Sequence, residues 1–131
     1  AVEFLPHLAR PQLAGLFRQA ALAVSPSEHD GTPNTLLEAM ACGCLPIAGD
    51  IEALREWITP GENGLLFDPA DAHALAAAIS RGIEDVALRE RAAKQNARLV
   101  ADRAEYRASM AKAEGFYRHL LQERRSGRDR V

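Results

Sequence analysis

Residues 22–50, LAVSPSEHDGTPNTLLEAMACGCLPIAGD, contain the pattern that decides the fold. The two ends of this stretch, Leu22 to Ser25 and Leu45 to Ala48, are short apolar runs bounded by turn residues, which is typical of buried strands. Between them, Asn34 to Cys42 has helical spacing and stops at Gly43. A strand, a helix and a second strand in this order predict a parallel βαβ unit.

The same alternation continues in both directions from this stretch. Upstream, Val2 to Leu5 is predicted as a strand and Gln12 to Ala21 as a helix; downstream, Ala53 to Ile58 is a short helix and Gly64 to Phe67 a fourth strand. We therefore expect an α/β fold with a Rossmann-like parallel sheet of about four strands and helices on both faces. A strand at the first residues also indicates that upstream strands of the same sheet are missing from the chain.

The last part of the chain is helical throughout. It predicts three consecutive helices: Ala72 to Gly82, Val86 to Ala104 and Glu105 to Arg125. The predicted organisation is therefore Rossmann-like βα units over 1–70, C-terminal helices of the same domain over 71–125 and a frayed tail over 126–131. Just before the fourth strand, the pair Asn63-Gly64 is typical of a turn with positive φ.

Length and composition are those of a globular domain. The chain has 131 residues, 47% hydrophobic and 26% charged, with a formal net charge of −2. No window of 18 apolar residues and no secretory leader is recognisable, so a membrane span is not expected. The two cysteines, Cys42 and Cys44, are too few for a disulfide framework, which favours a reducing, cytoplasmic location.

Charge is unevenly distributed along the chain. Residues 1–80 contain three basic and ten acidic residues, whereas residues 81–131 contain thirteen basic and eight acidic residues. The basic half mixes both signs at helical spacing and has few aromatic residues, so we expect solvated helix faces and no nucleic-acid partner. Arg124 and Arg125 keep open one alternative, a peripheral contact of a longer enzyme with anionic lipid.

The loop after the first quoted strand has the densest functional signal. It leaves the carboxyl end of a strand and enters a helix, the position at which open α/β sheets bind ligands. With Thr32 as N-cap and Pro33 as the first helical residue, the backbone N–H groups of Asn34, Thr35 and Leu36 would be free. Free N–H groups at a helix start favour an anion such as phosphate.

Two carboxylates flank this predicted phosphate site. Asp30 lies in the loop, and Glu38 shares a helix face with Asn34 because residues four apart stack on the same side. Leu36 and Met40 point the opposite way, into the core. Since carboxylates accept hydrogen bonds from hydroxyls, a ligand with both a diphosphate and sugar hydroxyls fits this arrangement.

The spacing of Asp30 and Glu38 resembles the acidic-x7-acidic motif of family 4 retaining glycosyltransferases, which have the two-domain GT-B fold. Gly61 to Pro69 is similar to the "nGlL" strand region of that family. The resemblance implies a partial C-terminal, donor-binding domain in which Asp30 and Glu38 are the catalytic residues and contact hydroxyls of the donor sugar and of the ribose. It implies substrate contacts at six further positions: Gly31, Thr32, Asn34, Thr35, Leu36 and His7.

The activity that the resemblance implies is retaining transfer of a sugar from a nucleotide-diphosphate donor to an acceptor hydroxyl, without metal or cofactor. The N-terminal acceptor domain and a basic pair of the family are missing, so we expect a hexosyl- or glycosyltransferase fragment that is inactive alone and self-associates through an exposed sheet edge. The chain departs from the family at three places: Asp30 stands where the family more often has glutamate, and Pro33 and the pair Glu52-Ala53 replace glycines. Two alternatives remain, a non-catalytic nucleotide-binding or regulatory module and a helical interaction module built from 72–125.

Overall fold

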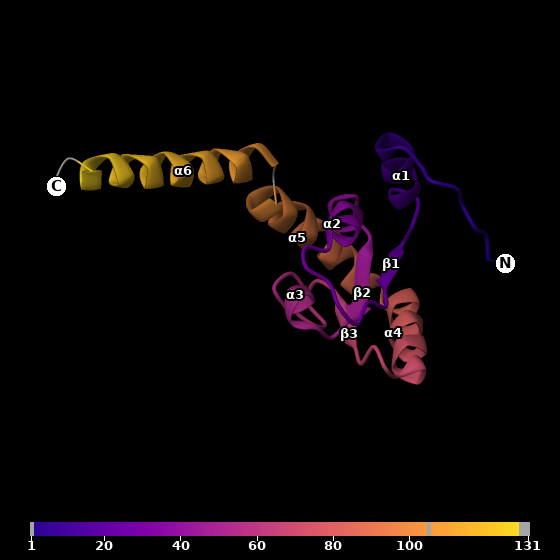
Figure 1. Ribbon diagram of the computed structural model, residues 1–131. Coiled ribbons are helices and arrows are strands. Elements are labelled where there is room, and N and C mark those ends of the chain that lie inside the picture. Colours follow the sequence, from indigo (N-terminus) through magenta and orange to yellow (C-terminus); the bar gives the residue numbers. More distant parts are fainter. Residues whose placement is uncertain (1, 105, 129–131) are drawn as a thin grey trace.

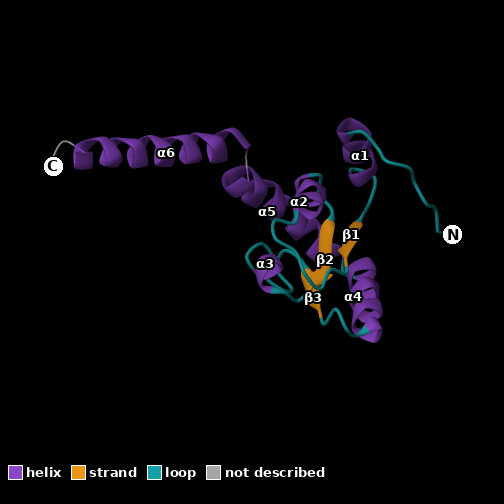
Figure 2. Ribbon diagram, viewed as in Figure 1, coloured by secondary structure: helices purple, strands orange, loops and turns teal. Residues whose placement is uncertain are grey.

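The computed structural model describes residues 2–104 and 106–128. At its centre is a parallel sheet of three strands in the order β1-β2-β3 (Figure 1). The strands are β1 (Leu22–Ser25), β2 (Leu45–Gly49) and β3 (Leu65–Phe67). The helices are α1 (Arg10–Phe17), α2 (Asn34–Ala41), α3 (Glu52–Arg55), α4 (Ala72–Glu84), α5 (Val86–Ala104) and α6 (Tyr106–Arg128). The predicted α/β class is confirmed, with helices flanking the strands as Figure 2 shows.

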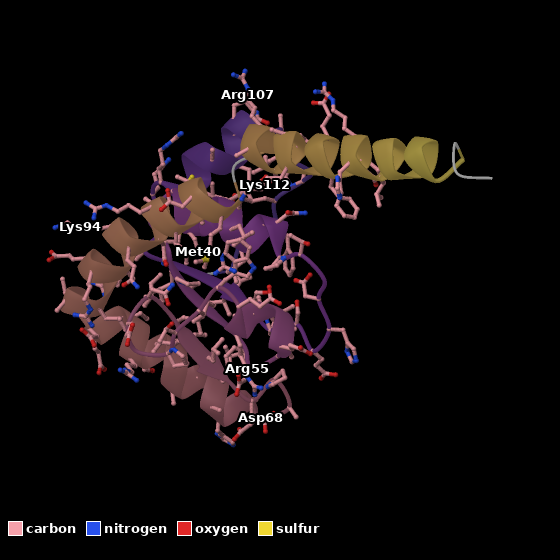
Figure 3. The ribbon with its side chains drawn as sticks, turned by 90° about the vertical axis from the view of Figure 1, so that its left-hand side faces the viewer. Met40, Arg55, Asp68, Lys94, Arg107 and Lys112 are labelled. Atoms are coloured by element: carbon pink, nitrogen blue, oxygen red, sulfur yellow. The ribbon has the colours of Figure 1, made fainter. Side chains whose placement is uncertain are left out.

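The central strand β2 is buried on both faces of the sheet. All five of its residues are buried, and successive side chains point to opposite faces. On one face Ala48 packs with apolar residues of α2, α3 and the turn after α3: Leu36, Leu37, Met40, Leu54 and Ile58 (Met40 is labelled in Figure 3). On the other face Leu45 and Ile47 pack with β3 and α5: Leu65, Phe67, Leu88 and Ala92.

Helix α5 crosses from one core to the other. Its first half contributes Leu88 and Ala92 to the core that contains β3. Its second half places Leu99, Val100 and Ala104 against the core under α2. The last residues of α5 therefore lie near the loop–helix segment that sequence analysis singled out.

The predicted first strand is wrong. Residues 2–9 form neither strand nor helix, and the side chains of Val2 and Phe4 are 86% and 94% exposed. A strand depends on a hydrogen-bonded neighbour and a buried face, and within the described residues this segment has neither. The described sheet consequently has three strands rather than four.

Helix α6 extends away from the body of the molecule (Figure 1). Residues 126–128, expected to fray, continue this helix, while the remainder of the predicted tail, 129–131, lies outside the described residues. The side chains of Arg124 and Arg125, on which the lipid alternative rests, also lie outside them. Among the helices that the structure describes, none combines the length and the apolar character needed to span a bilayer.

The glycine positions correct one turn prediction. Gly43 ends α2 with φ of 97°, as its place after the helical pattern predicted, and Gly61 has φ of 79°. The pair Asn63-Gly64, however, does not adopt positive φ. Gly64 is required for another reason, because a Cβ there would come within 2.8 Å of Ile58 and Pro46.

The exposed edge of β1 predicts that the chain self-associates. β1 is an outer strand, and Val24 is 43% exposed on it. Unpaired strand edges recruit other strands, so we expect the chain to form dimers or larger species at micromolar concentration. Sedimentation velocity measures this, with Val24→Lys as a variant that blunts the edge and shifts the population to monomer. A wild-type chain that sediments only as a compact 14.2 kDa monomer contradicts the prediction.

Candidate functional site

The start of α2 differs by one residue from the prediction. Pro33, not Thr32, is the N-cap, and no side-chain hydrogen bond caps the helix. The N–H of Asn34 donates to the carbonyl of Thr32 at 2.8 Å, so the turn before the helix is closed through the backbone of Thr32 rather than its hydroxyl. The predicted N-cap role of Thr32 is therefore wrong.

Two backbone donors at the start of α2 are available to a ligand. The N–H of Leu37 already donates to the carbonyl of Pro33 at 2.9 Å. The prediction of a free N–H at Asn34 is wrong, because this group donates to the carbonyl of Thr32. In the part of the chain that the structure describes, the N–H groups of Thr35 and Leu36 have no acceptor. They are the orphan donors of a helix N-terminus, where the helix dipole also favours negative charge.

Glu38 lies in a hollow beside α2. The hollow has a volume of about 730 Å³, and Glu38 and Asn34 enter it from the same exposed face of the helix. The other lining residues come from α1, α2, α5 and α6: Arg10, Leu37, Ala41, Val100, Ala104 and Ser109. We call this the Glu38 hollow. Arg10 brings a positive charge into it that sequence analysis did not predict, since α1 begins two residues earlier than its apolar spacing indicated.

Asp30 lies in a different hollow of about 410 Å³. Its lining residues come from the loop after β1 and from α3 with its flanking residues: Glu28, His29, Asp30, Gly31, Ile51, Glu52, Ala53 and Glu56. We call this the Asp30 hollow. Four of these residues are carboxylates, and among the described residues no Lys or Arg lines it. Asp30 and Glu38 therefore line separate hollows, connected in the chain by the start of α2.

The other predicted contact residues lie in varied surroundings. The side chain of Leu36 is 5% exposed and belongs to the core, so only its backbone N–H is available to a ligand. Thr35 is exposed, and Gly31 has open space around it. Thr32 is also exposed. His7 is exposed in the segment before α1 and lines neither hollow.

No metal centre is apparent in the described ranges, where no three His, Cys, Asp or Glu residues gather as ligands. The nearest ordered ion pair to the Asp30 hollow joins Asp50, at the end of β2, to Arg55 in α3 (Arg55 is labelled in Figure 3). The guanidinium donates from Nε to Oδ1 at 2.6 Å and from Nη2 to Oδ2 at 3.0 Å. These hydrogen bonds hold the pKa of Asp50 below its ordinary value, with a smaller contribution from the charge of Arg55.

The Asp50–Arg55 pair gives a second prediction. Arg55→Ala should return the pKa of Asp50 to the ordinary aspartate range, because the hydrogen bonds that favour its charged form are lost. Since the folded-state pKa is depressed, the pair stabilises the fold above the unfolded pKa, and this contribution is lost as pH falls through the folded value. NMR titration of the carboxyl carbon measures it, with Arg98→Ala as control. Identical Asp50 titration in both variants contradicts the prediction.

The comparisons with known proteins agree with one another. Residues 1–99 match the family described as "Glycosyl transferases group 1". Glycogen synthase of Mycobacterium tuberculosis is 35% identical over 105 residues, which are 78% of this chain and 25% of that protein. The chain thus spans about a quarter of the length of this curated relative.

Two solved structures are similar to the chain along most of its length. Sucrose-phosphate synthase from Thermosynechococcus elongatus has a TM-score of 0.87 and 31% identity, with 92% of this chain and 30% of that chain covered. The C-terminal domain of LpcC, a glycosyl transferase group 1 family protein from Francisella tularensis, has a TM-score of 0.68 and 28% identity. In that comparison 80% of this chain and 53% of the other chain are covered.

Proposed function

Because the chain belongs to the group 1 glycosyl transferases and has a GT-B-type fold, we propose that it forms the nucleotide-sugar donor site of a family 4 retaining glycosyltransferase. In this proposal the chain is the C-terminal, donor-binding part of a longer enzyme. A further domain supplies the acceptor site.

The observation that carries the proposal is the pair of free N–H groups at the start of α2. Thr35 and Leu36 lie in the chain between Asp30 and Glu38, and each of these carboxylates lines its own hollow. A diphosphate accepts hydrogen bonds from the two N–H groups, and the helix dipole adds about 0.3–1 kcal/mol at an exposed site. One extended ligand then places a sugar in one hollow and a nucleoside in the other.

Each carboxylate has a role suited to its hollow. Asp30 accepts hydrogen bonds from hydroxyls of the donor sugar, and Glu38 accepts them from the ribose hydroxyls in the hollow that Arg10 also lines. The helix N–H groups stabilise the charge that develops on the leaving diphosphate while the acceptor hydroxyl attacks. No step of this scheme requires a metal ion.

The test is donor binding by the chain, measured by calorimetry with UDP-glucose and GDP-mannose as probes. We expect the better probe to bind in the mM range, about −4 kcal/mol. Glu38→Ala should weaken this binding about ten- to a hundredfold, because a charge-assisted hydrogen bond to a ligand hydroxyl is worth roughly 1.5–3 kcal/mol.

Glu84→Ala is the matched control, since Glu84 is an exposed glutamate in α4, outside both hollows. It should bind like the wild type. Absence of heat for both probes at high concentration, or equal affinity in Glu38→Ala and wild type, contradicts the donor-site assignment.

The lack of Lys or Arg among the described residues of the Asp30 hollow favours a second candidate, nucleotide binding without transfer. A diphosphate leaving group needs positive charge that this hollow does not supply. Transfer activity separates the two candidates: we expect none from the chain alone, and sugar transfer once an acceptor domain is joined to it supports the enzyme.

A further inference from the structure

Arg103, in the last turn of α5, contacts the end of α3 in two ways. Its Nη1 donates to the backbone carbonyl of Glu56 at 2.7 Å, and its guanidinium carbon lies 4.5 Å from the centroid of the Trp57 ring. Glu56 is the C-cap residue of α3, and its carbonyl is one of those that a helix end leaves without an intrahelical partner. Arg103 thus holds the end of α3 across 47 residues of chain.

A second contact from α5 restrains the same segment. Asn96, seven residues before Arg103 and hence on nearly the same face of α5, exchanges hydrogen bonds with Asn63 at 2.8 Å. Asn63 in turn donates to the carbonyl of Trp57 at 2.9 Å and accepts from the N–H of Thr59 at 2.7 Å. The turn that follows α3 is therefore held at two points along one helix.

The segment needs such support because α3 has little stability of its own. It contains four residues, and its N-cap, Ile51, makes no side-chain cap hydrogen bond. A helix this short is not stable without tertiary contacts. Glu52, Ala53 and Glu56 of this segment nevertheless form one wall of the Asp30 hollow.

We infer that Arg103 is a positioning residue that sets the α3 wall of the Asp30 hollow, acting through the carbonyl of Glu56 and the ring of Trp57. The importance of the wall for a donor sugar rests on the proposed function. The next residue, Ala104, lines the Glu38 hollow, so the end of α5 lines one hollow and contacts the segment that forms a wall of the other. A displacement of α5 at this point would change both together.

The test compares Arg103→Ala with Arg98→Ala. Arg98 is an exposed arginine of the same helix, and it lines neither hollow. Backbone amide signals of residues 52–57 report the wall in 15N NMR spectra. The fluorescence of Trp57, the single tryptophan of the chain, reports the ring contact. We expect Arg103→Ala to shift these amide signals and to make Trp57 more accessible to iodide, and Arg98→Ala to do neither.

Binding of UDP-glucose and GDP-mannose is then measured for the same variants. Arg103→Ala should weaken the better probe about tenfold, and Arg103→Lys, which keeps a cation and a donor, should recover part of the loss. Unchanged signals over 52–57 in Arg103→Ala overturn the inference. So does wild-type affinity in a variant whose wall signals have moved, because the contact is then structural only.

Failure of the proposed function is distinguishable from failure of this inference. If the wild-type chain binds neither probe, the donor-site assignment fails. The amide signals of the wall then decide the positioning role by themselves: shifts specific to Arg103→Ala support it, and shifts confined to α5 overturn it.

Discussion

Asn96→Ala is expected to lower the free energy of unfolding by about 2–4 kcal/mol. The side chain of Asn96 is 0% exposed, and it both donates to the backbone carbonyl of Asn63 and accepts from the amide of Asn63. Removing it leaves a buried carbonyl without its donor and a small cavity. Urea denaturation followed by circular dichroism measures the loss.

Two further variants sharpen this prediction. Gln95→Ala changes the exposed neighbour of Asn96 on the same helix and should alter stability by less than about 0.5 kcal/mol. Asn96→Asp keeps the shape, but its carboxyl can donate to the carbonyl of Asn63 only while it is protonated, and burial raises the pKa of this new carboxyl. That variant should therefore lose stability as pH rises above the unfolded carboxyl value of about 3.9. Equal stability of Asn96→Ala and Gln95→Ala contradicts the role assigned to the asparagine pair.

Gly64→Ala is expected to destabilise the chain by about 1–3 kcal/mol through overpacking. A Cβ at this position would lie 2.8 Å from Ile58 Cγ2, 2.8 Å from Pro46 Cγ and 3.0 Å from the carbonyl oxygen of Pro46. The proline ring and the branched isoleucine cannot yield by a simple rotamer change, so β3 must move relative to β2. Thermal unfolding and loss of protection of β3 amides in hydrogen exchange are the measurements.

Gly15→Ala is the control for Gly64→Ala. Gly15 lies inside α1, and no atom lies within 4 Å of a Cβ built there. Alanine favours helix over glycine by about 1 kcal/mol, so this variant should be neutral or stabilising. A Gly64→Ala chain as stable as Gly15→Ala contradicts the close approach described for β3.

The βαβ unit from β1 to β2 could be predicted because its signals are local. Apolar runs, helical spacing and the terminating Gly43 all lie within one stretch of chain, and each agrees with the others. The segment of Val2 to Leu5 had an equally apolar pattern, yet it is not a strand in the structure. The difference is that a strand also requires a neighbour to pair with, which composition does not encode.

The candidate site was predictable in part for the same reason. The shared exposed face of Asn34 and Glu38 followed from helical spacing. The placement of Asp30 and Glu38 in separate hollows did not follow from helical spacing. The walls of the Asp30 hollow include residues of α3, and those of the Glu38 hollow include residues of α5 and α6. Arg10 was missed because a cation just before an apolar helical pattern has no local mark of function.

From β1 onward, the sequence by itself determined the order of strands and helices, the buried face of α2 and the exposed position of Glu38, since these depend on periodicity within single elements. Only the tertiary structure decided how α3 is held, because Asn63 meets Asn96 across 33 residues and Glu56 meets Arg103 across 47. In the sequence, Asn96 and Arg103 belong to a charged helix that is typical of a solvated surface. Their contacts arise from the packing of α5 against the sheet and α2, and long-range packing of this kind leaves no signal in local sequence spacing.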